Sequence, residues 1–135
     1  MKKYILLLTF ASFFVSCSED SGRKSETAEI LGNWKLTEIL IDPGDGSGTF
    51  EPYPENRTLE FLPNGKIFSN YHMCDITSNI VENVSYLGYY SADGNIIETE
   101  CFVEGQNITY ELVDGKLILH YPSYEGYSLK FVKVN

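Results

Sequence analysis

Glycine-containing turn signals interrupt the chain at short intervals, and they limit the possible folds more than any other feature. They read PNGK at residues 63–66, ADGN at 92–95, EGQN at 104–107, DGK at 114–116 and EG at 125–126. Asn-Gly and Asp-Gly tolerate the positive φ angles that tight hairpins require. The pattern therefore predicts short segments that reverse direction at each signal.

The segments between these signals alternate in polarity with a period of two residues. Ile108, Tyr110 and Leu112 fall on one face, and Thr109 and Glu111 fall on the other. Half-buried antiparallel strands produce this pattern. It predicts eight strands, at about residues 33–41, 57–62, 66–71, 85–90, 95–102, 107–112, 116–121 and 127–134.

Strands joined in sequence by tight turns form a meander, and eight of them can close into a barrel that has no unpaired edge. A helix is expected only as about one turn within residues 27–32. The predicted fold class is therefore an all-β, eight-stranded antiparallel up-and-down barrel that spans residues 28–135.

The N-terminus has the pattern of a secretory signal peptide. Lys2 and Lys3 precede an apolar run from Tyr4 to Val15. This run is shorter than the roughly 20 apolar residues that a membrane-spanning helix needs. We therefore assign residues 1–16 to a signal peptide and exclude them from the fold.

The sequence FVSC at residues 14–17 resembles the lipobox of bacterial lipoproteins. The resemblance implies lipidation of Cys17 and a membrane anchor. Residues 17–27 are polar and lack apolar periodicity, so they are expected to form a flexible tether. Glu19 and Asp20 resemble a signal for the outer face of the outer membrane, although two charges also suit a solvated linker. Ordinary cleavage nearby, with Cys17 as a spare thiol, is the alternative.

The chain has three cysteines, and an exported protein with an odd number leaves one unpaired. Lipidation of Cys17 would use the odd one. Cys74 and Cys101 are then expected to form a disulfide, because small exported β domains pair their cysteines more often than they keep reactive thiols.

The acidic balance argues against nucleic acid as a partner. The formal net charge is −9 for the whole chain, and removal of Lys2 and Lys3 with the signal peptide makes it −11. Phosphate binding needs clustered positive charge, and the sequence contains no basic stripe. The length suits a single domain, expected to be monomeric.

Gly32, Asn33 and Trp34 form a G-x-W at the start of the first expected strand. With the lipobox, the eight strands and the closing SLKFVKVN, this motif makes residues 28–135 similar to the lipocalin-like domain of bacterial lipoproteins. The resemblance implies that Gly32 and Trp34 pack at the closed barrel end and that Lys130 or Lys133 covers the tryptophan. The chain is shorter than classical lipocalins and lacks their C-terminal helix.

The run DPGDGSGTF at residues 42–50 resembles a calcium loop, but its spacing does not fit the EF-hand. That template needs oxygen ligands at positions 3 and 5 and glycine at 6, where this run has Gly44, Gly46 and Ser47. We interpret residues 42–56 as a connector and as a lid over the barrel mouth. The candidate ligand-mouth residues are Asp42, Asp45, Phe50, Tyr53 and Tyr124. Weak calcium binding by Asp42, Asp45 and Glu51 stays open.

Catalytic motifs are lacking, because His72 and His120 stand in no metal-binding spacing. No catalytic residue, metal or cofactor is expected. Two functions remain. The first is a binding module for a small apolar molecule, a glycan or a peptide at the open barrel end. The second is an envelope-structural or protein-interaction role, including inhibition of a secreted hydrolase, with the interior filled by Trp34, Leu36, Phe61 and Phe131.

Overall fold

The computed structural model describes residues 28–74, 80, 84–99 and 106–135. These residues form nine strands and one three-residue helix at 28–30, so the all-β prediction is confirmed. No helix within the described ranges is long and apolar enough to cross a membrane. The strands are β1 (Gly32–Ile41), β2 (Phe50–Pro52), β3 (Thr58–Phe61), β4 (Lys66–Ser69), β5 (Tyr86–Ser91), β6 (Ile96–Glu98), β7 (Ile108–Val113), β8 (Lys116–Tyr121) and β9 (Tyr127–Val134).

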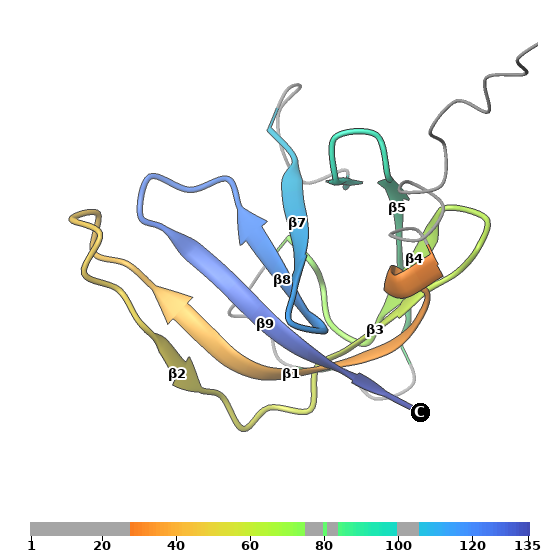
Figure 1. The fold of residues 1–135 in the computed structure, drawn as a ribbon, viewed down its shortest axis with the longest axis horizontal. Coiled ribbons are helices and arrows are strands. Elements are labelled where there is room, and N and C mark those ends of the chain that lie inside the picture. The colour runs from red at the N-terminus through yellow and green to blue at the C-terminus, as the bar shows by residue number, and fades with distance from the viewer. Residues whose placement is uncertain (1–27, 75–79, 81–83, 100–105) are drawn as a thin grey trace, which may run out of the picture.

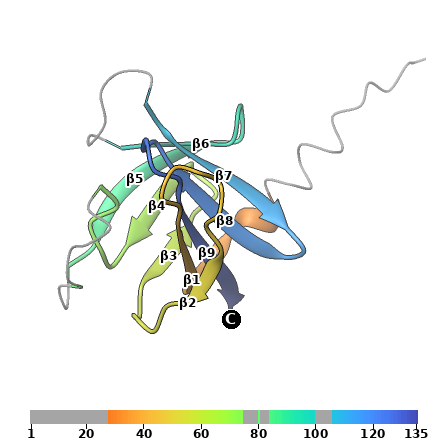
Figure 2. The ribbon, with the colours of Figure 1, turned by 90° about the vertical axis from the view of Figure 1, so that its left-hand side faces the viewer.

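The strands form one antiparallel sheet in which β9 pairs with β1 and closes the barrel (Figures 1 and 2). From β3 to β9, each strand pairs with the next one along the chain. Strand β1 pairs with β3 through residues 32–35 and with β2 through residues 38–40. Eight strands therefore close the barrel, as predicted, and β2 is an extra strand within the segment that was expected to be a connector.

The hairpin turns adopt the backbone geometry that their sequences predict. Gly65, Gly94 and Gly115 have φ angles of 77°, 83° and 71°. Asn95 and Asp114 also have positive φ, at 52° and 51°. Asn and Asp tolerate this region better than most residues with a side chain. Each turn signal thus marks where one strand ends and the next strand begins.

The helix of residues 28–30 and the start of β1 close one end of the barrel. The Trp34 indole is buried, and its Nε1 donates a hydrogen bond of 2.7 Å to the carbonyl of Ile30. Lys133 Nζ lies 5.4 Å from the centre of the indole ring and donates to the Glu29 carbonyl at 2.7 Å. Lys133, rather than Lys130, therefore covers the tryptophan. Gly32 joins the helix to β1 with a φ of 109°.

Apolar side chains from almost every strand fill the barrel interior. The four residues expected inside, Trp34, Leu36, Phe61 and Phe131, are each at most 2% exposed. They belong to one cluster with neighbours from the other strands, including Leu59, Ile67, Ile97, Ile108, Leu117, Leu119 and Leu129. Phe61 also meets the rings of Tyr90 and Tyr110 edge to face. The packed interior is the main source of fold stability.

Several predictions fall on residues outside the described part of the chain. These are the signal peptide of residues 1–16, Cys17 and the tether of residues 17–27, and Cys101. Cys74 is described and is disulfide-bonded. Its pairing with Cys101 stays a prediction.

Candidate ligand-binding site

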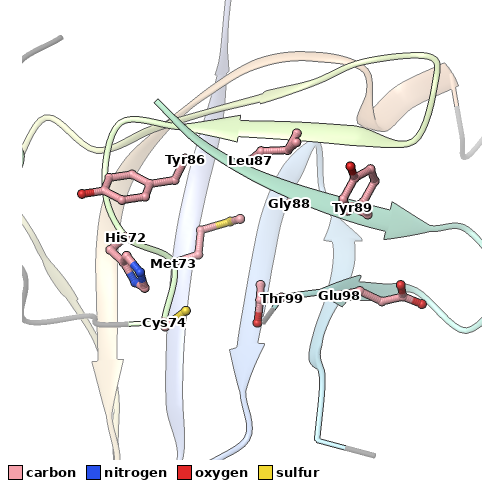
Figure 3. Close-up of a pocket in the computed structure, with 9 residues that line it drawn as sticks. All are labelled: His72, Met73, Cys74, Tyr86, Leu87, Gly88, Tyr89, Glu98 and Thr99. Atoms are coloured by element: carbon pink, nitrogen blue, oxygen red, sulfur yellow. The ribbon is translucent and has the colours of Figure 1, made fainter. Parts of the chain in front are cut away.

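A pocket of about 570 Å³ lies in the barrel wall beside β5 and β6 (Figure 3). Among the described residues, these strands pair only from Tyr89 opposite Glu98 to Ser91 opposite Ile96. The first half of β5 continues along β4 instead, from Tyr86 opposite Ser69. The pocket occupies the region beyond the last described β5–β6 pair, and the segment after β4 supplies its third side.

The pocket floor consists of Met73, Gly88 and Thr99. The segment after β4 keeps the two-residue alternation of that strand, so Tyr71 and Met73 are buried like Ile67. A Cβ atom placed on Gly88 would lie only 2.5 Å from Met73 Cε. Glycine at this position is therefore what allows the methionine methyl group to rest against β5.

The pocket rim is more exposed and largely aromatic or aliphatic. Leu87 and Tyr89 point outward from β5 and are 48% and 50% exposed. The rings of His72 and Tyr86 pack edge to face, and their centres are 5.0 Å apart. Figure 3 shows this pair on one side of Met73, with Tyr89 and Glu98 on the other. The rim thus offers exposed apolar surface beside a buried floor.

Glu98 is the charged side chain among the nine described residues that line this pocket. No Lys or Arg is among them, so the lining does not favour an anion. Within the described residues, no group of three or more His, Cys, Asp or Glu side chains could hold a metal ion. The lining is suited to non-covalent contact with a mainly apolar molecule.

A second polar feature lies inside the barrel, around Arg57. Arg57 lies in the chain between β2 and β3, directly before Thr58, and it is only 1% exposed. Its Nε donates to the Glu55 carboxylate at 2.7 Å. Its guanidinium carbon lies 5.0 Å from the ring centre of Tyr71 and 5.7 Å from that of Tyr53. The Tyr71 and Tyr121 hydroxyls are 3.4 Å apart.

The environment of this cluster fixes the protonation of its members. Burial alone would lower the pKa of Arg57, but the Glu55 carboxylate raises it above its ordinary value. The hydrogen bond from Arg57 lowers the pKa of Glu55. Burial raises the pKa of Tyr71 to about 12, and it also raises that of Tyr121. The cluster is therefore a charged pair beside neutral phenols, and its buried members Arg57, Tyr71 and Tyr121 fill space that an interior ligand would need.

The carboxylate of Asp42 organises the glycine-rich connector. Its Oδ1 accepts hydrogen bonds from the amides of Gly44 and Gly46, at 2.7 and 3.0 Å, and Oδ2 accepts from Gly48 at 2.7 Å. These amides lower its pKa. The Asp42 amide donates to the Gly126 carbonyl at 2.7 Å, which ties the connector to the β8–β9 hairpin at the left of Figure 1. These contacts tie the connector to the hairpin, and its role as a lid over the barrel mouth stays a prediction.

The other four candidate mouth residues do not converge on one site. Asp45 accepts from the Ser47 amide, and Phe50 lies under Lys130 Nζ, which is 3.7 Å from its ring centre. Tyr53 packs beside Arg57, whereas Tyr124 is fully exposed in the β8–β9 hairpin. None of the five mouth residues lines the pocket beside β5 and β6.

The sequence analysis overlooked Arg57 and the pocket residues Met73, Gly88 and Thr99. A signal for Arg57 was present, because Arg57, Leu59 and Phe61 alternate along one face of the expected second strand, residues 57–62. The pocket had no comparable signal, since it depends on where two neighbouring strands stop pairing.

Comparison with protein-family models, with curated proteins and with solved structures finds no match for this chain.

Proposed function

We propose that this chain is a lipid-anchored envelope lipoprotein whose barrel binds a small, mainly apolar molecule in the pocket beside β5 and β6. The pocket itself is the observation that carries the proposal. Its volume of about 570 Å³ lies within the range of known ligand pockets, roughly 300–1,000 Å³. Known ligand pockets are lined mainly by apolar and aromatic side chains. This pocket has exposed Leu87 and Tyr89 on its rim and buried Met73 in its floor.

The envelope location rests on the sequence. The charged start, the short apolar run and the position of Cys17 support lipid attachment, and the polar residues 17–27 would space the barrel from a membrane. The closed antiparallel barrel is the architecture that the resemblance to lipocalin-like domains implies. We therefore propose a lipocalin-like lipoprotein of the bacterial outer membrane.

We propose a binding module rather than an enzyme. In the pocket, His72 packs its ring against Tyr86. On the outside of the barrel, His120 contacts the Ser128 hydroxyl at 2.8 Å and the Glu111 carboxylate at 3.1 Å. The second arrangement brings a hydroxyl, an imidazole and a carboxylate within hydrogen-bonding reach, as in a catalytic triad. Ser128 is buried at 7% exposed, however, and none of the three residues lines the pocket, so we favour binding.

The test is binding of the fluorescent apolar probe N-phenyl-1-naphthylamine to the mature chain carrying Cys17→Ser, which removes the predicted lipid acceptor. Leu87→Asp puts a charge on the pocket rim and should weaken binding about tenfold, because apolar contact is replaced by a hydrated carboxylate. Val113→Asp is the matched control, since Val113 is 42% exposed on β7 and does not line the pocket. Equal loss in both variants would show that the probe binds elsewhere.

The second candidate function is interaction with another protein. It is favoured by the packed interior and by Tyr124, a fully exposed aromatic side chain in the β8–β9 hairpin. Exposed aromatic residues with a polar tip are common at protein interfaces. Failure of the unsubstituted pocket to bind any apolar probe would favour this second function.

A further inference from the structure

Thr99 carries a polar atom that the fold leaves unsatisfied. Its Oγ1 is less than 1 Å² exposed and has no hydrogen-bond partner among the residues that the structure describes. A hydroxyl can donate one hydrogen bond and accept two, and burying it without a partner is unfavourable. Unsatisfied buried groups are rare in native proteins and gather where a ligand or another functional constraint compensates for them.

The position of this hydroxyl connects it to the pocket. Thr99 lines the pocket directly after β6, below Gly88 and Met73 in the view of Figure 3. A ligand in the pocket could satisfy Oγ1 only if a neighbouring side chain moved, because the atom is covered. Among the described residues that line the pocket with Thr99, Met73 is buried, at 3% exposed, and has a flexible side chain that can move.

Met73 has the properties of a displaceable cover. Its side chain has three rotatable bonds and a polarizable thioether, so it can repack at low cost. Its terminal methyl group lies where β5 presents Gly88, which has no side chain to lock it in place. Met73 also belongs to the core cluster while lining the pocket, so it separates the pocket from the barrel interior.

We propose that the Thr99 hydroxyl is the hydrogen-bonding anchor for the pocket's ligand and that the ligand reaches it by displacing the Met73 side chain. This inference rests on the binding function proposed above. It specifies an uncharged ligand with an aromatic or aliphatic body and one hydroxyl or carbonyl group. Glu98 disfavours an anion, and a neutral hydroxyl alone is a poor partner for a buried cation.

The first experiment compares three probes that share one apolar body: naphthalene, 2-naphthol and 2-naphthoate. The mature chain with Cys17→Ser should bind 2-naphthol about 3- to 10-fold more tightly than naphthalene, as expected for one net hydrogen bond. It should bind 2-naphthoate most weakly. Thr99→Val should abolish the preference for 2-naphthol, whereas Thr99→Ser, which keeps the hydroxyl, should retain it.

The second measurement is the melting temperature of the same variants without a probe. Thr99→Val removes an unsatisfied hydroxyl without changing the shape of the side chain, so the free protein should be at least as stable as the unsubstituted one. A gain in stability together with a loss of ligand preference is expected of a residue kept for binding.

The outcomes separate this inference from the function on which it rests. If the unsubstituted chain binds none of the three probes, the proposed pocket function and the anchor both fail. If it binds them but Thr99→Val keeps the preference for 2-naphthol, the anchor alone is overturned. A clear loss of stability in Thr99→Val would also overturn it, because the hydroxyl would then have a partner within the protein.

Discussion

In the sequence, the Asp42 carboxylate resembles a metal ligand. In the structure, it accepts hydrogen bonds from backbone amides. Three glycine N–H groups occupy its two oxygens within the connector. Gly48 is necessary for this arrangement, because a Cβ there would lie 2.8 Å from Asp42 Cα. A cation would have to compete with these donors for the same oxygens. The connector is therefore built around its own aspartate, and we expect it to keep this arrangement without calcium.

Asp42→Ala should lower the melting temperature by several degrees at neutral pH. Asp45→Ala should lower it less, because the only described backbone amide that donates to the Asp45 carboxylate is that of Ser47. The folded state lowers the pKa of Asp42 below 3.8, so the carboxylate contributes stability above that pH. This contribution is lost as the pH falls through the lower, folded-state pKa. The difference between Asp42→Ala and the unsubstituted protein should disappear in the same acidic range.

Millimolar calcium should leave the melting temperature unchanged. A site whose Kd lay tenfold below the added calcium would stabilise the folded state by about 1.4 kcal/mol, a shift that melting detects easily. A calcium-dependent rise that disappears in the Asp42→Ala, Asp45→Ala double variant would refute the connector interpretation.

At the level of strands, most of the elements could be predicted, because their turns and their alternating polarity are encoded in short stretches of sequence. Tight turns with Gly65, Gly94 and Gly115 have local sequence signals, and the strands between them alternate in polarity. Strand β2 was missed because it has only three residues and lies between a glycine-rich run and Pro54. Its existence depends on pairing with the second half of β1. No local pattern encodes such a pairing.

The location of the pocket was not predictable from the sequence, which pointed to residues at the open barrel mouth, and none of them lines the pocket. Arg57 follows the alternation of β3, but a charged residue is normally assigned to the surface. Its burial depends on Glu55 and on tyrosines that are distant in sequence, such as Tyr71. The pocket depends on how far β5 pairs with β4 and with β6, which is a tertiary property.

The whole molecule combines a packed barrel interior with a pocket in its wall, where we propose that the ligand binds. A classical barrel binder holds its ligand inside, whereas here the interior contains Trp34, Phe61, Phe131 and Arg57, which are each at most 1% exposed. Eight strands give an interior that side chains can just fill. The pocket described above lies in the wall beside β5 and β6, so ligand entry need not open the barrel.

Attachment to the membrane is the second property that we propose for the whole molecule. Metabolic labelling with a fatty-acid probe should mark the unsubstituted protein, and Cys17→Ala should remove the label, because the thiol of Cys17 is the expected acceptor. Ser21→Ala in the tether should leave the labelling unchanged. A label that persists in Cys17→Ala would place the acceptor elsewhere and would leave the envelope location without its present basis.

One NMR titration tests most directly whether the ligand binds in the barrel wall rather than in the interior. The chain has one tryptophan, Trp34, and two methionines, of which Met1 lies in the expected signal peptide. The Met73 methyl group and the Trp34 indole N–H therefore each give a resonance that can be assigned by type. Saturation with 2-naphthol should shift the Met73 methyl resonance and leave the Trp34 resonance in place. A shift of Trp34 with Met73 unchanged would contradict the wall site and place the ligand in the barrel interior.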